Sequence, residues 1–185
     1  MEMHHGAVAR VEIRRAARER VVVAVDVDPF AGEHLRALMR RFPAGVAVVG
    51  VDLEGERLGL TIGTLIPLSL SPPLVGFAVR REAALHELLR RARRFGVSLL
   101  AAGQEDVAQH FARGVPPIAL WERIAVRDAD GPPLLEGALG WLTGEVVEDV
   151  AAGEDTFFVG TVDSIETGAA GARPLLYVDR RYVTA

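Results

Sequence analysis

Cysteine is absent from this chain of 185 residues. Its absence excludes disulfide bonds, thiolate catalysis and cysteine-ligated metal sites. No apolar run approaches the ~20 residues that a membrane-spanning helix requires. The first six residues have no apolar core, so we expect no secretory signal and no contact with a membrane. These absences together predict a cytoplasmic protein.

An excess of positive charge is also missing, because the formal net charge is -4. Nucleic acid and anionic membranes are therefore not expected partners. The histidines have no spacing typical of metal ligands: His4 and His5 open the chain, and His34 and His86 fall on predicted helices without a second ligand one turn away. We predict no metal site and no Ser-His-Asp triad.

The length fits one domain with a substantial core. We place an N-terminal arm and strand at residues 1–28 and a barrel domain at 29–185. Residues 1–20 are rich in arginine, which indicates a solvated arm or a frayed helix. The density of β-branched residues from Val21 to Val27 predicts a strand.

Three helices and seven or eight strands are expected in all, the strand at 21–27 included. Asp28 is the expected N-cap of a helix whose apolar face is Leu35, Leu38, Met39 and Phe42. Further helices are predicted at 83–94 and 104–112. The predicted strands are 46–51, 57–62, 74–79, 96–101, 138–150, 156–166 and 175–183. Strands that rarely alternate with helices favour a mostly β (α+β) antiparallel barrel over a dinucleotide-binding sheet.

The segment from Gly59 to Val79 combines glycine and hydroxyl residues with a Pro72-Pro73 entry into an apolar strand. It resembles the signature of the flavin reductase-like, FMN-binding split-barrel family. Five further segments resemble that family in matching order: 35–49, 94–104, 110–112, 153–160 and 174–182. The resemblance covers most of the chain, from about Leu35 to Tyr182.

The resemblance implies a six-stranded antiparallel split β-barrel with a few flanking helices. It also implies a homodimer with flavin at the interface. Such proteins transfer hydride from NADH or NADPH to FMN or FAD, and many supply reduced flavin to a partner monooxygenase. The resemblance places these residues on the cofactor: Gly59, Thr61, Gly63, Thr64, Leu65, Ile66, Ser69, Arg80, Arg81, Ala84, Phe111 and Tyr182. Phe111 is also a candidate core residue, because its helix has an apolar face.

Several polar positions of the family pattern are altered here. Gly63 stands where an asparagine is usual, and Ile66 and Pro67 supply no side-chain or backbone donor, respectively. The usual Ser-x-Thr phosphate clamp is replaced by residues 80–84, in which Glu82 adds a negative charge. Three lost contacts of about 1 kcal/mol each would weaken binding on the order of 100-fold. The alternative function is therefore a flavin-free barrel whose altered pocket binds or converts another small apolar ligand.

Two residues are predicted to take part in catalysis. Asp155 stands where many members of the family have a histidine beside the nicotinamide. A carboxylate there orients an amide but is not an imidazole that shuttles protons near neutral pH. His110 lies at the end of a helix that the resemblance places near the nicotinamide. Hydride transfer itself requires alignment of the two rings more than a protein acid. Asp155 in place of a histidine is therefore compatible with flavin reduction.

Overall fold

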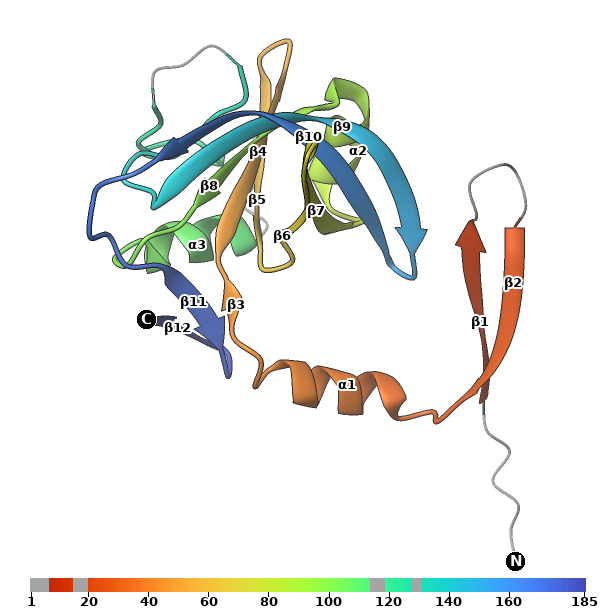
Figure 1. Ribbon diagram of the computed structural model, residues 1–185. Helices are drawn as coiled ribbons and strands as arrows, with labels where there is room; N and C mark the ends of the chain where they lie inside the picture. The colour runs from red at the N-terminus through yellow and green to blue at the C-terminus, as the bar shows by residue number, and fades with distance from the viewer. Residues whose placement is uncertain (1–6, 15–19, 114–118, 128–130) are drawn as a thin grey trace, which may run out of the picture.

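A curled seven-stranded sheet forms the body of the protein (Figure 1). The computed structural model describes residues 7–14, 20–113, 119–127 and 131–185, and for 7–14 and 20–27 it gives the backbone alone. The order of the sheet is β5-β4-β8-β9-β10-β7-β6, and all its pairings are antiparallel. Its strands are β4 (Ala47–Leu53), β5 (Glu56–Ile62), β6 (Ile66–Leu70), β7 (Pro73–Arg80), β8 (Arg94–Leu99), β9 (Gly140–Ala152) and β10 (Asp155–Thr167).

A smaller sheet has the order β12-β11-β3. Its strands are β3 (Ala44–Gly45), β11 (Leu175–Val178) and β12 (Arg181–Thr184). The sequence predicted one strand over 175–183, whereas Asp179 and Arg180 adopt positive φ angles of 47° and 61° and reverse the chain. This turn pairs Tyr177 with Tyr182 across the hairpin.

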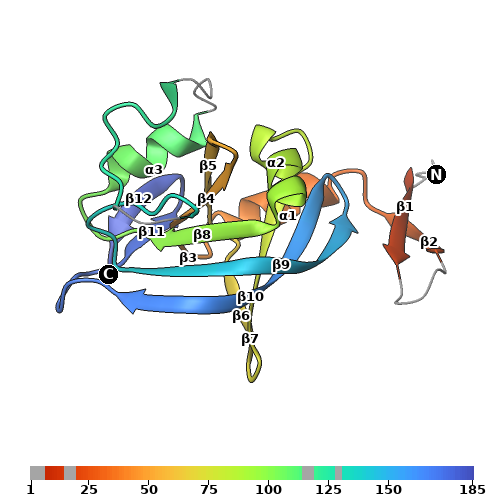
Figure 2. The ribbon, with the colours of Figure 1, turned by 90° about the horizontal axis from the view of Figure 1, so that it is seen from above.

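Three buried phenylalanines form the centre of the core. Phe77 lies 5.3 Å from Phe95 and 6.0 Å from Phe158 between ring centroids. Edge-on and offset contacts of this kind add to the free energy gained by burying the rings. The helices α2 (Ala84–Ala92) and α3 (Glu105–Ala112) lie on the same side of the long strands β9 and β10 (Figure 2). None of the helices in the described ranges is long and apolar enough to cross a bilayer.

The mostly β split-barrel architecture with helices is confirmed, but the count of six strands is not. No strand was predicted at residues 66–70, inside the segment that resembles the flavin motif. These residues form β6, an edge strand that pairs with β7, with a shift in register between Pro67 and Ser69. An edge position tolerates Pro67, because the missing amide removes no hydrogen bond from the interior of the sheet.

The N-terminal segment forms a hairpin rather than a solvated arm or frayed helix. Strand β1 (Ala7–Arg14) pairs with β2 (Arg20–Val27), from Ala7 opposite Val27 to Arg14 opposite Arg20. The arginine content suggested a solvated segment, but apolar residues recur at every second position, as in a strand. His4, His5 and residues 128–130 lie outside the described residues. The boundary at 28/29 stays a prediction.

Helix α1 (Ala31–Met39) follows the hairpin and contains no buried residue. The N-cap is Phe30 rather than the predicted Asp28, which lies two residues earlier and accepts a 3.0 Å hydrogen bond from the Phe30 amide. The predicted apolar face is solvent-exposed throughout: Leu38 is 64% and Phe42 66% exposed. An apolar face of this size, left exposed among the described residues, indicates an interaction surface.

Candidate functional site

Two clefts flank the segment from Gly59 to Glu82, and the larger lies at its start. This cleft, with a volume of about 710 Å³, lies between the end of β5, the end of α3 and the β11–β12 hairpin. It is lined by Ala44, Val46, Thr61, Ile62, Gly63, Gln109, Ala112, Tyr177, Arg180, Arg181 and Tyr182. The volume lies within the usual range for small-molecule sites. Three predicted cofactor residues, Thr61, Gly63 and Tyr182, thus share one cavity.

The hydroxyl groups of the motif bind the protein's own backbone. Thr61 Oγ1 donates a 2.7 Å hydrogen bond to the carbonyl of Ala108 and so joins β5 to α3. Thr64 Oγ1 accepts a 3.0 Å bond from the amide of Ala78 and donates at 3.3 Å to the carbonyl of the same residue. In this arrangement each threonine donates its single hydroxyl proton to a backbone carbonyl of the protein. They position the motif, and any bond to a ligand would use their remaining lone pairs.

Gly59 is required for packing rather than for an unusual backbone angle. A Cβ atom at this position would lie 2.7 Å from Cε1 of Phe111 and 2.9 Å from Cζ2 of Trp121. Phe111 is fully buried, and its ring lies 4.8 Å from that of Trp121. This burial agrees with the alternative that Phe111 is a core residue, and its role at the cofactor stays a prediction.

An aromatic pair and two arginines form the outer wall of the larger cleft. The rings of Tyr177 and Tyr182 are 5.1 Å apart and tilted. Burial, reinforced by nearby Tyr177, raises the pKa of Tyr182, so its hydroxyl keeps its proton near neutral pH. Arg180 and Arg181 come from the turn beside it. This wall offers flat apolar surfaces next to positive charge, a combination suited to a planar, anionic ligand.

The second cleft, of about 430 Å³, lies at the other end of the motif and is lined by Arg80, Arg81, Glu82 and Glu154. Arg80 Nη2 is 3.6 Å from Glu154 Oε2, and its Nε is 3.9 Å from Asp155 Oδ1. The amide of Arg81 donates to the carbonyl of Glu154 at 3.1 Å. Carboxylates of the β9–β10 turn and of β10 therefore face the arginines that were predicted to bind phosphate.

The remaining predicted residues lie between the two clefts or next to them. Leu65 packs against the core, Ile66 is exposed on β6, and Ser69 is half-buried opposite Leu74. Ala84 is exposed at the first position of α2.

The two predicted catalytic residues are not brought together. His110 Nε2 contacts the carbonyl of Leu120 at 2.7 Å, next to the larger cleft, whereas Asp155 faces Arg80 at the smaller one. Their elements, α3 and the start of β10, lie on opposite sides of β6 (Figure 1).

A buried histidine joins α2 to β10 close to Asp155. His86 on α2 forms a 2.8 Å hydrogen bond with Thr156 on β10 and packs edge-on against Phe158. Burial is the main cause that lowers the pKa of His86, and the positive charge of Arg90 is the next largest. Glu87 and Asp149 oppose the shift, and Arg81 adds a smaller effect in the same direction as burial. The imidazole is therefore neutral in the folded protein at neutral pH.

We predict that acid weakens the fold through His86. Because its pKa is lower in the folded than in the unfolded state, the unfolded chain binds the extra proton first. This part of the stability is complete above the ordinary pKa of 6.5 and declines as the pH falls below it. The free energy of unfolding is measured by urea denaturation at about pH 7.5 and about pH 5.5. Its decrease between these two pH values should be smaller in His86→Gln than in the unsubstituted protein. Exposed His34→Gln is the control, and an identical pH response in both variants would contradict the assignment.

Sequence reasoning missed five polar or aromatic residues that line the two clefts: Gln109, Tyr177, Arg180, Arg181 and Glu154. A signal existed for Tyr177, Arg180 and Arg181, because they belong to the C-terminal segment 174–182 that carried the resemblance. No local pattern marked Gln109 or Glu154, which reach the clefts through the packing of α3 and the pairing of β10 with β7.

The comparisons with known proteins agree with this geometry. The family model described as flavin reductase like domain matches residues 39–185. The chain is 38% identical over 150 residues to the reductase component of 4-hydroxyphenylacetate 3-monooxygenase from Thermus thermophilus, covering 81% of this chain and 94% of that protein. It is 34% identical over 159 residues to an NADH:FMN oxidoreductase of Rhodococcus erythropolis, covering 82% and 80%.

A solved structure gives the same result. The NADH:FAD oxidoreductase of Streptomyces globisporus, solved in complex with NAD and FAD fragments, superposes with a TM-score of 0.78 and 32% sequence identity. The match covers 85% of this chain and 94% of that one. The chain therefore belongs to the flavin reductase-like family.

Proposed function

We propose that this protein is an NAD(P)H-dependent flavin reductase that reduces FMN or FAD and supplies reduced flavin to a partner monooxygenase in the cytoplasm. The observation that carries the proposal is the larger cleft, which lies against the flavin motif of a chain whose relatives are named as flavin reductases. Thr61 and Gly63 at the end of β5, facing Tyr182 from β12, form walls of the size that a flavin ring needs.

The residues of the larger cleft fit the ring end of a flavin. When bound, flavin supplies the hydride-accepting ring, and the protein's task is to align the ring with the nicotinamide and to exclude water. Tyr177 and Tyr182 provide flat apolar contact, and Gln109 provides an amide. The hydrogen bond from Thr61 to Ala108 fixes the end of β5 against α3, two of the elements that enclose the cleft. The phosphate end fits less well, because carboxylates occupy the surroundings of Arg80.

The proposal includes a homodimer, which two exposed apolar surfaces support. One is the face of α1, where Leu38, Met39, Arg41 and Phe42 border a hollow of about 570 Å³. The other is edge strand β6, where Ile66 and Leu68 are exposed and Leu70 is 89% exposed. Apolar surface of this extent is normally covered by a partner. In such a dimer, His110 of one subunit and Asp155 of the other are the pair proposed to act on one ligand.

NADH oxidation tests the proposed function directly. The purified protein should oxidise NADH or NADPH only when flavin is added, and the reduced flavin should support turnover by a flavin-dependent monooxygenase added to the same mixture. A control without the protein measures the direct reaction between the two cofactors. Absence of flavin-dependent oxidation with FMN, FAD and riboflavin alike would reject the proposal.

A second candidate is a barrel whose altered pocket binds or converts another small apolar ligand. The internal hydrogen bonds of Thr61 and Thr64 favour it, since both hydroxyl protons are already donated. An absorbance titration separates the two: saturable perturbation of the flavin spectrum supports the reductase, and an unperturbed spectrum supports the alternative.

A further inference from the structure

We infer that the smaller cleft selects flavins by charge, so that uncharged riboflavin binds at least as well as FMN. The inference rests on the proposed function, because it concerns the phosphate end of the same site. It goes further by naming the kind of flavin that the site accepts best and the residues that decide it: Glu82, Glu154 and Asp155.

Arg80 is already paired with protein carboxylates. Its guanidinium lies 3.6 Å from Glu154, in the β9–β10 turn, and 3.9 Å from Asp155, the first residue of β10. The pairing of β10 with β7 places Asp155 directly opposite Arg80, so the sheet itself holds these charges together. A phosphate that binds Arg80 has to compete with both.

The charge around Arg81 is also balanced. Arg81 and Glu82 immediately precede the first turn of α2, whose N-cap Ala83 supplies no side-chain hydrogen bond. The amide end of a helix attracts anions, and Glu82 brings its own negative charge to that end. The two arginines and two glutamates that line the cleft carry no net charge, and Asp155, 3.9 Å from Arg80, adds one negative charge beside them.

This charge balance penalises a phosphate monoester. FMN carries close to two negative charges on its phosphate at neutral pH, whereas riboflavin carries no phosphate. In water, two unit charges about 4 Å apart change an equilibrium constant roughly fivefold, and salt weakens the effect. Attraction by the arginines and repulsion by the carboxylates are therefore of similar size, and the phosphate adds little to affinity.

The first test compares the KM values of riboflavin and FMN at low and high salt. We expect a KM for riboflavin equal to or below that for FMN, and a KM for FMN that stays constant or falls as salt is added. A KM for FMN at least tenfold below that of riboflavin and rising with salt would overturn the inference. Quenching of flavin fluorescence measures the same ratio as Kd without turnover. A protein that reduces no flavin but shows the expected ratio of Kd values for riboflavin and FMN would contradict the proposed reaction. The same result would still support selection of flavins by charge.

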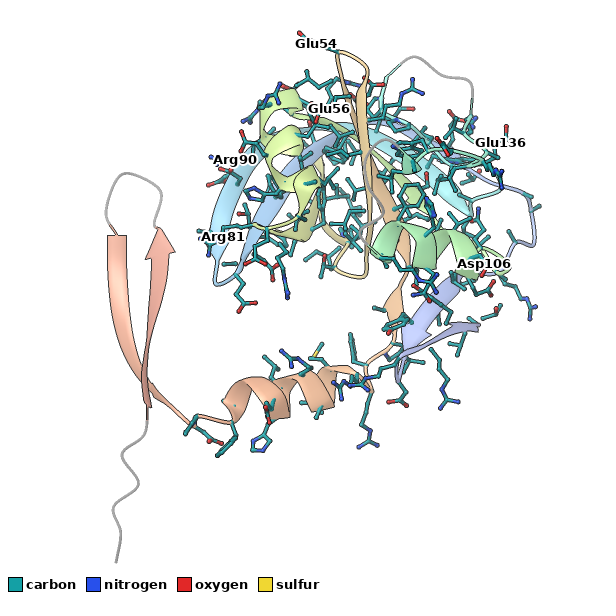
Figure 3. The ribbon with its side chains drawn as sticks, turned by 180° about the vertical axis from the view of Figure 1, so that it is seen from behind. Glu54, Glu56, Arg81, Arg90, Asp106 and Glu136 are labelled. Carbon is teal, nitrogen blue, oxygen red and sulfur yellow. The ribbon has the colours of Figure 1, made fainter. Side chains whose placement is uncertain are left out.

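The second test removes the negative charge. Glu82→Gln combined with Glu154→Gln should lower the Kd for FMN about tenfold and leave that for riboflavin within twofold. The control pair Glu54→Gln and Glu136→Gln makes the same change in net charge at positions that Figure 3 shows well away from Arg81. An equal change for both flavins, or the same effect in the control pair, would overturn the inference.

Discussion

Replacing Leu38 with glutamate should convert the proposed dimer into a monomer and lower kcat/KM for flavin reduction more than tenfold. Leu38 is 64% exposed on a helix with no buried residue, so the substitution disrupts no buried contact within one subunit. In a dimer it would place a carboxylate against an apolar face. Burial of an unpaired charge costs several kcal/mol, which corresponds to on the order of 100-fold or more in the dissociation constant.

Ala37→Glu is the matched control for this substitution. Ala37 is the preceding residue and lies well away from the apolar face around the helix, so the same charge enters the same helix but points elsewhere. Light scattering after size-exclusion chromatography should find a monomer for Leu38→Glu and a dimer for Ala37→Glu. Circular dichroism should show both variants folded. A Leu38→Glu protein that remains dimeric would show that α1 does not form the interface.

The activity measurement connects the interface with the site. Flavin reduction by Leu38→Glu should recover as protein concentration rises, because mass action restores the dimer. Activity per subunit in Ala37→Glu should be independent of concentration over the same range. If monomeric Leu38→Glu kept full activity, the cleft of one subunit would be sufficient, and the proposed sharing of Asp155 and His110 between subunits would be wrong.

Much of the barrel follows from local sequence patterns. The run of buried apolar residues from Val46 to Val51 and the alternating run in β10 predicted strands to within two residues. The face of α2 that carries Leu85, Leu88 and Leu89 predicted a buried helix. These elements are readable because one face of each must enter the core, and that requirement leaves a period in the sequence.

Strand β6 and strand β1 were not predicted, whereas the predicted strand at 21–27 corresponds to β2. Five residues at a sheet edge, with Pro67 among them, do not alternate clearly between core and solvent. In residues 7–14 the arginines favour a solvated segment, whereas the alternation of apolar residues favours the strand that forms. The error at β6 comes from a short strand at a sheet edge, where burial imposes little pattern.

The clefts depended on contacts between distant segments. The resemblance identified Gly63 and Tyr182 separately, but only the packing of β5 against the β11–β12 hairpin places them in one cavity. The pairing of Arg80 with Glu154 and Asp155 follows from the register of β10 on β7, which no local pattern encodes. Some residues that line the clefts were therefore recognisable as members of motifs, whereas their charge balance and partners were not.

Gly144→Ala should cost the protein at least about 3 kcal/mol of unfolding free energy, the largest effect that we expect from a single methyl group. Gly144 lies on β9 opposite Val162, where the long β9–β10 pair changes register. A Cβ atom there would overlap the carbonyl oxygen of Thr161 and lie 2.9 Å from the ring of Phe95. A strand backbone in the middle of a sheet cannot move aside without breaking its hydrogen bonds, so the clash is expensive.

Two further substitutions isolate the cause. Gly160→Ala would also clash with the ring of Phe95. Unlike at Gly144, the nearest backbone atom, the carbonyl oxygen of Glu145, is 3.3 Å away. Phe95→Leu should therefore partly rescue Gly160→Ala and fail to rescue Gly144→Ala, which a double-mutant cycle in urea would measure. Gly32→Ala, in helix α1 with no atom within 4 Å of the new Cβ, should be neutral or slightly stabilising. Equal rescue of both strand variants by Phe95→Leu would mean that the aromatic ring, and not the Thr161 carbonyl, limits residue size at position 144.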